Sequence, residues 1–219
     1  MFYEPAKQNH GLKLTPYKSC IVPRPIGWIS TVSPAGRVNL APYSQFNNLG
    51  YEPGYLMFSA GGQHPDGHRK DSVINAEATG AFVYNMATYD LREAVNRTAQ
   101  IIDSSIDEMR AAGLTAAPSR LVKPPRVAES PINIECTYYT TLVLPGDTIR
   151  TTHYVVVGKV VGVHVKDEYL TADGKIDVVK IRPLARLGYL DYTSVQSSFT
   201  LDVEEDVRDF MTLGMSGGR

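Results

Sequence analysis

The sequence SAGGQHPDGHRKDS, residues 59–72, combines the residue types that bind a phosphate group. Two glycines follow an apolar stretch, and two cations, Arg69 and Lys70, then precede a helix-like sequence that begins near Ser72. The free N–H groups in the first turn of a helix and the positive end of its dipole attract anions, and the two cations add formal charge. Arg69, Lys70 and Ser72 are therefore candidate phosphate ligands, with a solvated basic turn of the same composition as the alternative.

A second set of polar groups lies in residues 24–50, RPIGWISTVSPAGRVNLAPYSQFNNLG. Ser30 and Thr31 end an apolar strand, where their hydroxyls could complete a phosphate cradle or satisfy buried backbone groups. The following NLAPYS is a poor strand sequence, because Pro lacks a donor and Asn is depleted from sheets. Its short residues leave backbone groups accessible, as a flat heteroaromatic ligand beside an apolar face requires. The segment is either an edge strand that turns a corner or the wall of a binding site.

Other catalytic and metal-binding motifs are absent from the sequence. It contains no GxGxxG, Walker A, HExxH or GxSxG motif and no paired CxxC. His64 and His68 flank Asp66, but turn residues separate them and no third soft ligand is nearby. Because zinc sites use about three or four protein ligands, we expect no metal site.

The segments that must position these candidates are mostly strand-like. Runs rich in Val, Ile, Tyr and Thr alternate with turn signals such as SPAG at residues 33–36. The predicted strands are Gly27–Ser33, Val38–Pro42, Gly54–Ala60, Gly80–Ala87, Ile132–Leu144, His153–Lys166 and Lys175–Ile181. Since they follow one another without a β-α-β rhythm, we expect a closed or sandwiched antiparallel sheet.

Helical signals are few. We expect a short helix over Ser72–Ala78 and a terminal one over Val203–Leu213. Asp90 and Ser105 each precede a Glu by three residues, a spacing typical of capping boxes, and predict two more helices. The Pro- and Ala-rich residues from Leu114 to Ser130 predict an excursion across the surface.

Composition restricts the class of protein. The 219 residues can bury a substantial core, and 43% hydrophobic with 21% charged residues is ordinary for a globular chain. A formal net charge of -1 gives no electrostatic signature for nucleic acid or an anionic membrane. No signal peptide or membrane span is visible, and Cys20 and Cys136 form no CxxC, so we expect a reduced, cytoplasmic protein. Without a convincing linker, residues 1–219 are expected to form a single domain.

Four segments carry a recognisable pattern: PRPIGWISTVSPAGRVNLAPYSQFN, RKDSVINAEATGAFVYNMA, THYVVVGKVVGVHV and PLARLGYLDYTSV. In this order they resemble the flavin reductase-like family of FMN-binding split-barrel proteins, over roughly residues 18–195. The resemblance implies a mainly β fold with added helices, a six-stranded antiparallel Greek-key split β-barrel, followed by a C-terminal extension over residues 196–219. It also implies a homodimer with flavin bound near the subunit interface.

The same resemblance implies roles for individual residues. Ser30 and Thr31 should face the flavin phosphate and ribityl chain. Arg69, Lys70 and Ser72 match the family's R-K-D-S/T and should bind the 5′-phosphate. The residues that should line or adjoin the isoalloxazine are Asn39, Leu40, Ala41, Pro42, Ser44 and Asn47.

His153 is the candidate catalytic residue. It matches a histidine that lies by the flavin face or the nicotinamide pocket in relatives, while a histidine satisfied on a strand is the alternative. Thr152 precedes it where relatives often carry Asp, which leaves the orientation of the imidazole open. Tyr189 follows Gly188 at a position where other family members carry a second glycine. Its side chain could fill space that they leave for a substrate, so the identity of the ligand that binds beside the flavin is left open.

The activity that the resemblance implies is NAD(P)H-dependent reduction of FMN, with FAD as a second candidate. Hydride would pass from nicotinamide, of NADH or NADPH, to flavin N5, and reduced flavin could reach a partner monooxygenase. One alternative is a flavoredoxin-like electron carrier with permanently bound FMN. The other is a flavin-binding protein without NAD(P)H turnover, or one that acts on a bound small substrate as pyridoxamine-phosphate oxidases do.

Overall fold

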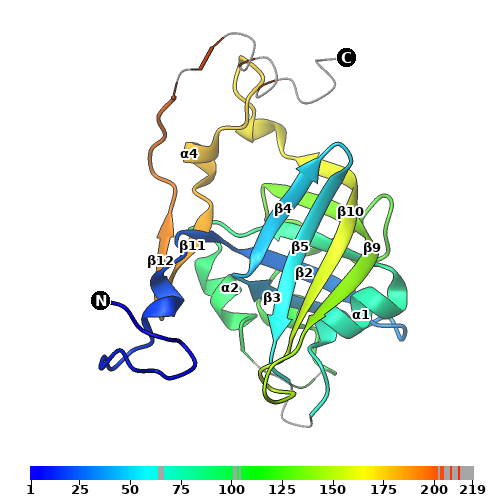
Figure 1. Ribbon diagram of the computed structural model, residues 1–219. Coiled ribbons are helices and arrows are strands. Elements are labelled where there is room, and N and C mark those ends of the chain that lie inside the picture. Colours follow the sequence, from blue (N-terminus) through cyan, green and yellow to red (C-terminus); the bar gives the residue numbers. More distant parts are fainter. Residues whose placement is uncertain are drawn as a thin grey trace.

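A seven-stranded antiparallel sheet, in the order β3-β2-β6-β9-β10-β5-β4, curves around a common core (Figure 1). The computed structural model describes residues 1–63, 67–100, 103, 105–201, 203, 204, 208 and 212. The strands of this sheet are β2 (Gly27–Val32), β3 (Val38–Tyr43), β4 (Phe46–Tyr51), β5 (Gly54–Gly61), β6 (Ala81–Met86), β9 (Ile132–Leu144) and β10 (His153–Val165). The expected class, mainly β with few helices, is confirmed.

The remaining elements are short. They are η1 (Pro16–Ser19), β1 (Arg24–Pro25), α1 (Asp71–Thr79), α2 (Arg92–Arg97), α3 (Glu108–Ala111), β7 (Ala116–Ala117), β8 (Arg126–Val127), η2 (Asp167–Tyr169), α4 (Val178–Ile181), β11 (Leu184–Gly188) and β12 (Asp191–Ser194). None of the helices in the described part of the chain is both long and apolar enough to cross a membrane.

Six of the seven barrel strands coincide with predicted strands to within one residue at each end, and β4 is the exception. Its sequence, FNNLGY, is rich in Asn and Gly, which strands disfavour. Pairing with β5 places Phe46 opposite Phe58, and the Phe46 ring stacks on Tyr84 with centroids 4.7 Å apart. Burial of this one aromatic side chain on the barrel core therefore outweighs the poor propensity of its neighbours.

The predicted strand Lys175–Ile181 is wrong, because its second half forms the helical turn α4. The β-branched Val178 and Val179 suggested a strand. However, the Asp177 side chain caps the turn by accepting from the Lys180 N–H over 2.9 Å. Arg182, with φ of 53°, then ends the turn. Ile176 forms only an isolated bridge with Leu170, and the local cap decides the conformation of the residues that follow it.

The two predicted capping boxes do not form. Helix α2 follows Leu91 without a side-chain cap, and α3 is capped by Asp107, whose carboxylate accepts from the Arg110 N–H over 3.0 Å. The predicted terminal helix Val203–Leu213 lies largely outside the described residues. The predicted surface excursion contains β8, where Val127 is fully buried, so this segment also contributes to the core.

Helix α1 closes the barrel core. Val73 and Ala76 on its buried side pack in one cluster with Phe58, Phe82 and Val156. A second cluster lies on the other face of β2 and includes Trp28, Val95 and Met109. The indole N–H of Trp28 donates to Thr98 Oγ1 over 2.9 Å and joins β2 to the end of α2.

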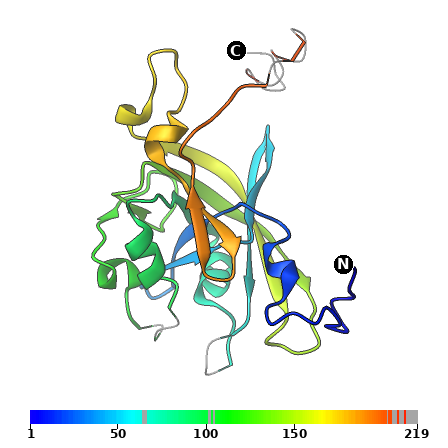
Figure 2. The ribbon, with the colours of Figure 1, turned by 90° about the vertical axis from the view of Figure 1, so that its left-hand side faces the viewer.

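The N-terminal segment lies beside a second sheet, ordered β1-β11-β12 (Figure 2). Ser19 Oγ donates to the Leu187 carbonyl over 2.7 Å, and Tyr189 OH donates to the Thr15 carbonyl over 3.2 Å. Gly188 is needed at this junction, because its φ is +106° and a Cβ would lie 2.6 Å from the Lys18 carbonyl oxygen. The N-terminal segment is thus fastened to β11 next to the barrel.

Candidate flavin site

A cavity of about 100 Å³ lies between β3 and the start of α1 and is called here the β3–α1 cavity. Five predicted site residues line it, namely Asn39, Ala41, Pro42, Lys70 and Ser72. Its other walls are Tyr43, Asp71, Thr98, Ala99, Gln100 and Glu108. Strand β3 and the turn before α1 are distant in sequence, but the fold brings both candidate segments around one cavity.

A buried hydrogen-bond network fixes the β3 side of this cavity. Ser72 Oγ donates to Asn39 Oδ1 over 2.8 Å and accepts from Tyr43 OH over 3.0 Å. Thr31 Oγ1 donates to the same Asn39 oxygen over 3.2 Å and accepts from Asn75 Nδ2 over 3.2 Å. Burial raises the pKa of Tyr43 well above its ordinary value, so the phenol stays protonated and can donate. The hydroxyls of Thr31 and Ser72 are thus satisfied within the protein.

Glu108, which the sequence indicates only as part of a helix start, also belongs to this cavity. Its Oε2 accepts from Asn39 Nδ2 over 2.5 Å and from the Leu40 N–H over 2.6 Å. Burial raises the pKa of Glu108 to about 7, against these two hydrogen bonds, and the nearby carboxylate of Asp71 adds to the rise. No sequence signal identified this role, because α3 reaches β3 only through the tertiary fold.

Lys70 and Arg69 lie side by side in sequence but differ in their partners. Arg69 donates to both carboxylate oxygens of Glu77, over 3.0 and 2.7 Å, and lies over the Tyr154 ring. Lys70 is half-buried, and within the described part of the chain its ammonium has no hydrogen bond or ion pair. Burial lowers the pKa of Lys70, against the attraction of Asp71 and Glu108. Lys70 is the cation of the pair that is available to a ligand.

A larger cavity of about 520 Å³ begins where β3 ends and is called here the His153 cavity. Two predicted residues, Ser44 and His153, line it together. The other lining residues are Tyr17, Lys18, Ile21, Arg24, Gln45, Arg186 and Tyr189. Because Tyr43 lines the first cavity and Ser44 the second, the end of β3 runs along both.

Arg24 in this cavity is a polar residue that no motif in the sequence singles out. Its Nη1 donates to the carbonyls of Lys18 and Ile21, over 3.2 and 2.7 Å. Its Nε is buried, and within the described residues it has no hydrogen-bond partner. A buried donor without a partner is costly, so the two Nη1 hydrogen bonds hold Arg24 in this position against that cost. The PRP sequence around Arg24 contains no spacing that indicates this.

The position of the His153 imidazole depends on a neighbouring residue, Gly61, that has no side chain. Gly61 lies directly opposite it in the β5–β10 ladder, and a Cβ at Gly61 would lie 2.5 Å from the imidazole Cε1. We expect Gly61→Ala to turn the exposed His153 ring away while changing the free energy of unfolding by less than about 1 kcal/mol. Reduction of flavin by NADH should slow if His153 acts there, and steady-state kinetics would measure this.

Gly50→Ala is the matched control, because a Cβ there meets only the Pro53 carbonyl at 3.5 Å. Unchanged kinetics in Gly61→Ala, with a displaced imidazole seen by NMR, would remove His153 from the reaction.

The remaining predicted residues line neither cavity. Ser30 is fully buried, donates to the Pro125 carbonyl over 2.6 Å and accepts from Asn85 Nδ2 over 3.1 Å. Leu40 is fully buried behind the β3–α1 cavity. Asn47 is exposed on β4, where its side chain accepts from the Asn48 N–H over 3.0 Å. The Ser30 hydroxyl thus satisfies a buried backbone carbonyl, as the alternative interpretation expects, whereas the Thr31 hydroxyl bonds only to the side chains of Asn39 and Asn75.

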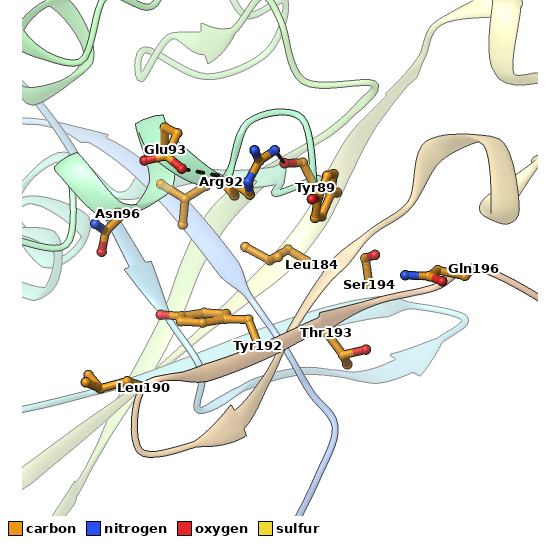
Figure 3. Close-up of a pocket in the computed structure, with 11 residues that line it drawn as sticks. Tyr89, Arg92, Glu93, Asn96, Leu184, Leu190, Tyr192, Thr193, Ser194 and Gln196 are labelled. Carbon is orange, nitrogen blue, oxygen red and sulfur yellow. Dashed lines mark hydrogen bonds and ion pairs between the residues drawn. The ribbon is translucent and has the colours of Figure 1, made fainter.

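A separate cavity of about 430 Å³ lies between α2 and the strands β11 and β12 (Figure 3). Tyr89 and Arg92 face it from the helix side, and Tyr192 and Leu190 face it from the strand side. Arg92 Nη1 donates to the Tyr89 carbonyl over 2.8 Å. None of the predicted flavin residues lines this cavity.

The part of the chain that the structure describes contains no recognisable metal-binding site. No group of three or more His, Cys, Asp or Glu side chains there could hold a metal ion. His64, which flanks Asp66 together with His68, lies outside the described residues.

Comparison with known proteins identifies the family. The sequence model of the flavin reductase like domain matches residues 19–184. The chain is also 35% identical over 196 residues to an uncharacterised protein of Halalkalibacterium halodurans, a match that covers 90% of this chain and 91% of that protein.

Solved structures of similar fold support the same assignment. Nitrilotriacetate monooxygenase component B from Bacillus cereus superposes with a TM-score of 0.82 at 28% identity, covering 92% of this chain and 98% of that one. A flavoredoxin of Desulfovibrio vulgaris (Miyazaki F) shares the fold with a TM-score of 0.70 at 18% identity, covering 89% and 98% of the two chains. The protein therefore belongs to the flavin reductase-like domain family and has its split-barrel fold.

Proposed function

We propose that the protein binds FMN along the end of β3 and catalyses its reduction by NADH or NADPH. The observation that carries this proposal, beside membership of the family, is the half-buried and unpaired ammonium of Lys70 in the β3–α1 cavity, within the described part of the chain. A cation without a partner there fits the phosphate of FMN. FAD is the second flavin that this arrangement could accept.

The residues present fit a flavin in two respects. Lys70 offers a charge to the phosphate at the start of α1, a nine-residue helix whose dipole has its positive end there. In the His153 cavity, the guanidinium groups of Arg24 and Arg186 offer donors to an acceptor on a ring edge. The charged form of Glu108 would repel a bound anion. Because its pKa is raised to about 7, a smaller fraction of Glu108 is charged near neutral pH than of an ordinary carboxyl group.

A bound flavin would supply the redox chemistry, accepting hydride at N5 from a nicotinamide. The protein itself then has to bind the flavin and the nicotinamide and to orient their rings. The Asn39–Ser72–Tyr43 network holds the end of β3 rigid, so that its backbone presents a fixed edge to the ring. Gly61 permits the imidazole of His153 to lie against β5 at the mouth of the second cavity. No side-chain nucleophile is required.

We propose further that the protein is a homodimer whose interface includes the β9–β10 hairpin. Leu142, Val143 and Leu144 are 56%, 50% and 47% exposed there, and Leu144 pairs with His153 in the ladder. Adjacent exposed apolar side chains on a protein of this size favour an interface. Such an interface would cover the mouth of the His153 cavity. Sedimentation of the purified protein at twice the chain mass would support this, and a monomer would exclude it.

Anaerobic addition of NADH or NADPH to the FMN-loaded protein tests the activity. We expect the visible flavin absorbance to bleach with one of the two nucleotides. Weak flavin retention with continuous NADH oxidation in excess FMN indicates a reductase that could supply a monooxygenase. Tight retention without NAD(P)H oxidation indicates a flavoredoxin-like carrier, and it would overturn the proposed reductase activity.

A further inference from the structure

A basic pocket of about 290 Å³ lies at the other end of β10 from His153. Its lining residues are Arg120, Arg126, Ala128, Pro131, Asn133, Val163, His164, Val165 and Lys166. His153 is the first residue of β10 and His164 is the last but one, so at most about 35 Å of extended strand separates them. No residue of this pocket lines the β3–α1 cavity or the His153 cavity. The basic pocket is therefore separate from the proposed flavin site.

The charge of the basic pocket is one-sided. Arg120, Arg126 and Lys166 line it, and none of the described lining residues is Asp or Glu. Within the described part of the chain, none of these three cations forms a salt bridge. The whole chain has a net charge of only -1, and the three cations around this cavity outnumber the single carboxylate, Glu135, that is buried against its lining residues in the described part of the chain. The pocket therefore keeps a local positive field.

Two of the cations are held in place by neutral acceptors. Arg126 donates from Nε and Nη2 to the Pro118 carbonyl over 3.2 and 3.1 Å, and from Nη1 to Asn133 Oδ1 over 3.3 Å. Lys166 Nζ donates to the Glu129 carbonyl over 3.1 Å. These contacts fix the side chains without neutralising them, which is the arrangement that preorganised oxyanion sites use.

A fully buried carboxylate, Glu135, positions the remaining two basic residues. It accepts from the Arg120 N–H over 2.8 Å and from His164 Nε2 over 2.5 Å. The N–H groups of Leu121 and Val122 donate to it over 2.6 and 3.1 Å. Burial would raise the pKa of Glu135, but these hydrogen bonds outweigh it and hold the pKa below its ordinary value. The buried charge thus binds the 120–122 loop to β9, which keeps Arg120 at the rim.

We propose that the basic pocket binds a phosphate group, either of inorganic pyrophosphate or of a nucleotide. Two guanidinium groups and an ammonium around one cavity match the charge and the several acceptor oxygens of a phosphate. The volume lies at the low end of the range for small-molecule sites, which suits a phosphate and part of the group that carries it. The side chain of Arg120 donates no hydrogen bond within the described residues, so it can turn to the ligand.

Isothermal titration of the FMN-saturated protein, in which the proposed flavin phosphate position is filled, tests the proposal at low ionic strength, with pyrophosphate and separately with ADP. We expect saturable one-to-one binding that weakens as sodium chloride is added. Arg120→Gln and Lys166→Gln should each weaken it at least about tenfold, since each removes a charge-assisted contact. Tighter binding of ADP than of pyrophosphate assigns the site to a nucleotide, and the reverse assigns it to the inorganic anion.

Two control variants show whether the bound phosphate occupies this pocket. Lys123→Gln changes an exposed cation of the same loop that does not line the pocket, and it should leave affinity within about twofold. Lys70→Ala removes the cation of the proposed flavin site and should also have no effect on pyrophosphate. The proposal is overturned if neither ligand binds saturably, if Arg120→Gln and Lys166→Gln bind as the parent does, or if Lys70→Ala abolishes binding. Unchanged thermal midpoints in the variants would show that they fold.

Discussion

Lys70→Ala is expected to weaken FMN binding by roughly 10- to 150-fold while leaving riboflavin binding nearly unchanged, a loss of about 1.5–3 kcal/mol. Only FMN carries the phosphate, and Lys70 is the cation of the β3–α1 cavity that has no partner within the described residues. Because the ammonium is half-buried, its interaction with a phosphate is screened less than that of a surface lysine. Fluorescence titration of both flavins against the purified protein measures the two affinities.

Arg69→Gln is the matched control for Lys70→Ala. The Arg69 guanidinium is occupied by both oxygens of Glu77, so its removal should cost less FMN affinity than removal of Lys70. The family resemblance implies a phosphate role for both residues, whereas the hydrogen bonds distinguish them. An equal loss of FMN and riboflavin in Lys70→Ala would mean that the variant disturbs the site as a whole, and the phosphate role would be abandoned.

Much of the barrel could be predicted because its strands carry their own signals. β9 and β10 are thirteen residues long and rich in Val, Ile, Tyr and Thr, and their limits follow directly from the sequence. β4 and β11 are different, because their own residues give little strand signal. Pairing with neighbouring strands keeps both of them extended. β11 pairs with β1 and β12, and no local pattern in LARLG indicates a strand with those neighbours. The main sheet, with β4 at its edge, has seven strands, one more than the six-stranded barrel that the resemblance implies.

The candidate site was predictable only in part, for a similar reason. The RKDS turn and the NLAPYS segment each show their chemistry locally, and the fold brings Lys70 and Asn39 to one cavity. Residue types alone could not show that Arg69 is bound by Glu77, or that Ser30 is buried against the Pro125 carbonyl. Glu108 was missed because its partners lie 68 and 69 residues away. Which side chains remain free for a ligand is decided by such long-range contacts.

Glu108→Gln is expected to remove much of a pH dependence of stability between about pH 4.5 and 7. Burial raises the pKa of Glu108 from 4.5 to about 7, so the folded protein binds this proton more tightly than the unfolded chain does. Its contribution to the free energy of unfolding is therefore complete below pH 4.5 and is lost as the pH rises towards 7. A shift of this size corresponds to about 3 kcal/mol. Urea unfolding at pH 5 and pH 8 measures it.

The glutamine variant keeps the shape of the site but not its titration. Its amide oxygen can still accept from Leu40 N–H and Asn39 Nδ2, so the variant should approach the wild type in stability at pH 5 and exceed it at pH 8. Glu93→Gln, which changes an exposed carboxylate on α2, should leave the pH profile as it is. A wild-type profile retained in Glu108→Gln would show that another group titrates in this range. The same carboxylate lies beside Lys70, so the protonation that stabilises the fold also removes a negative charge next to the proposed phosphate position.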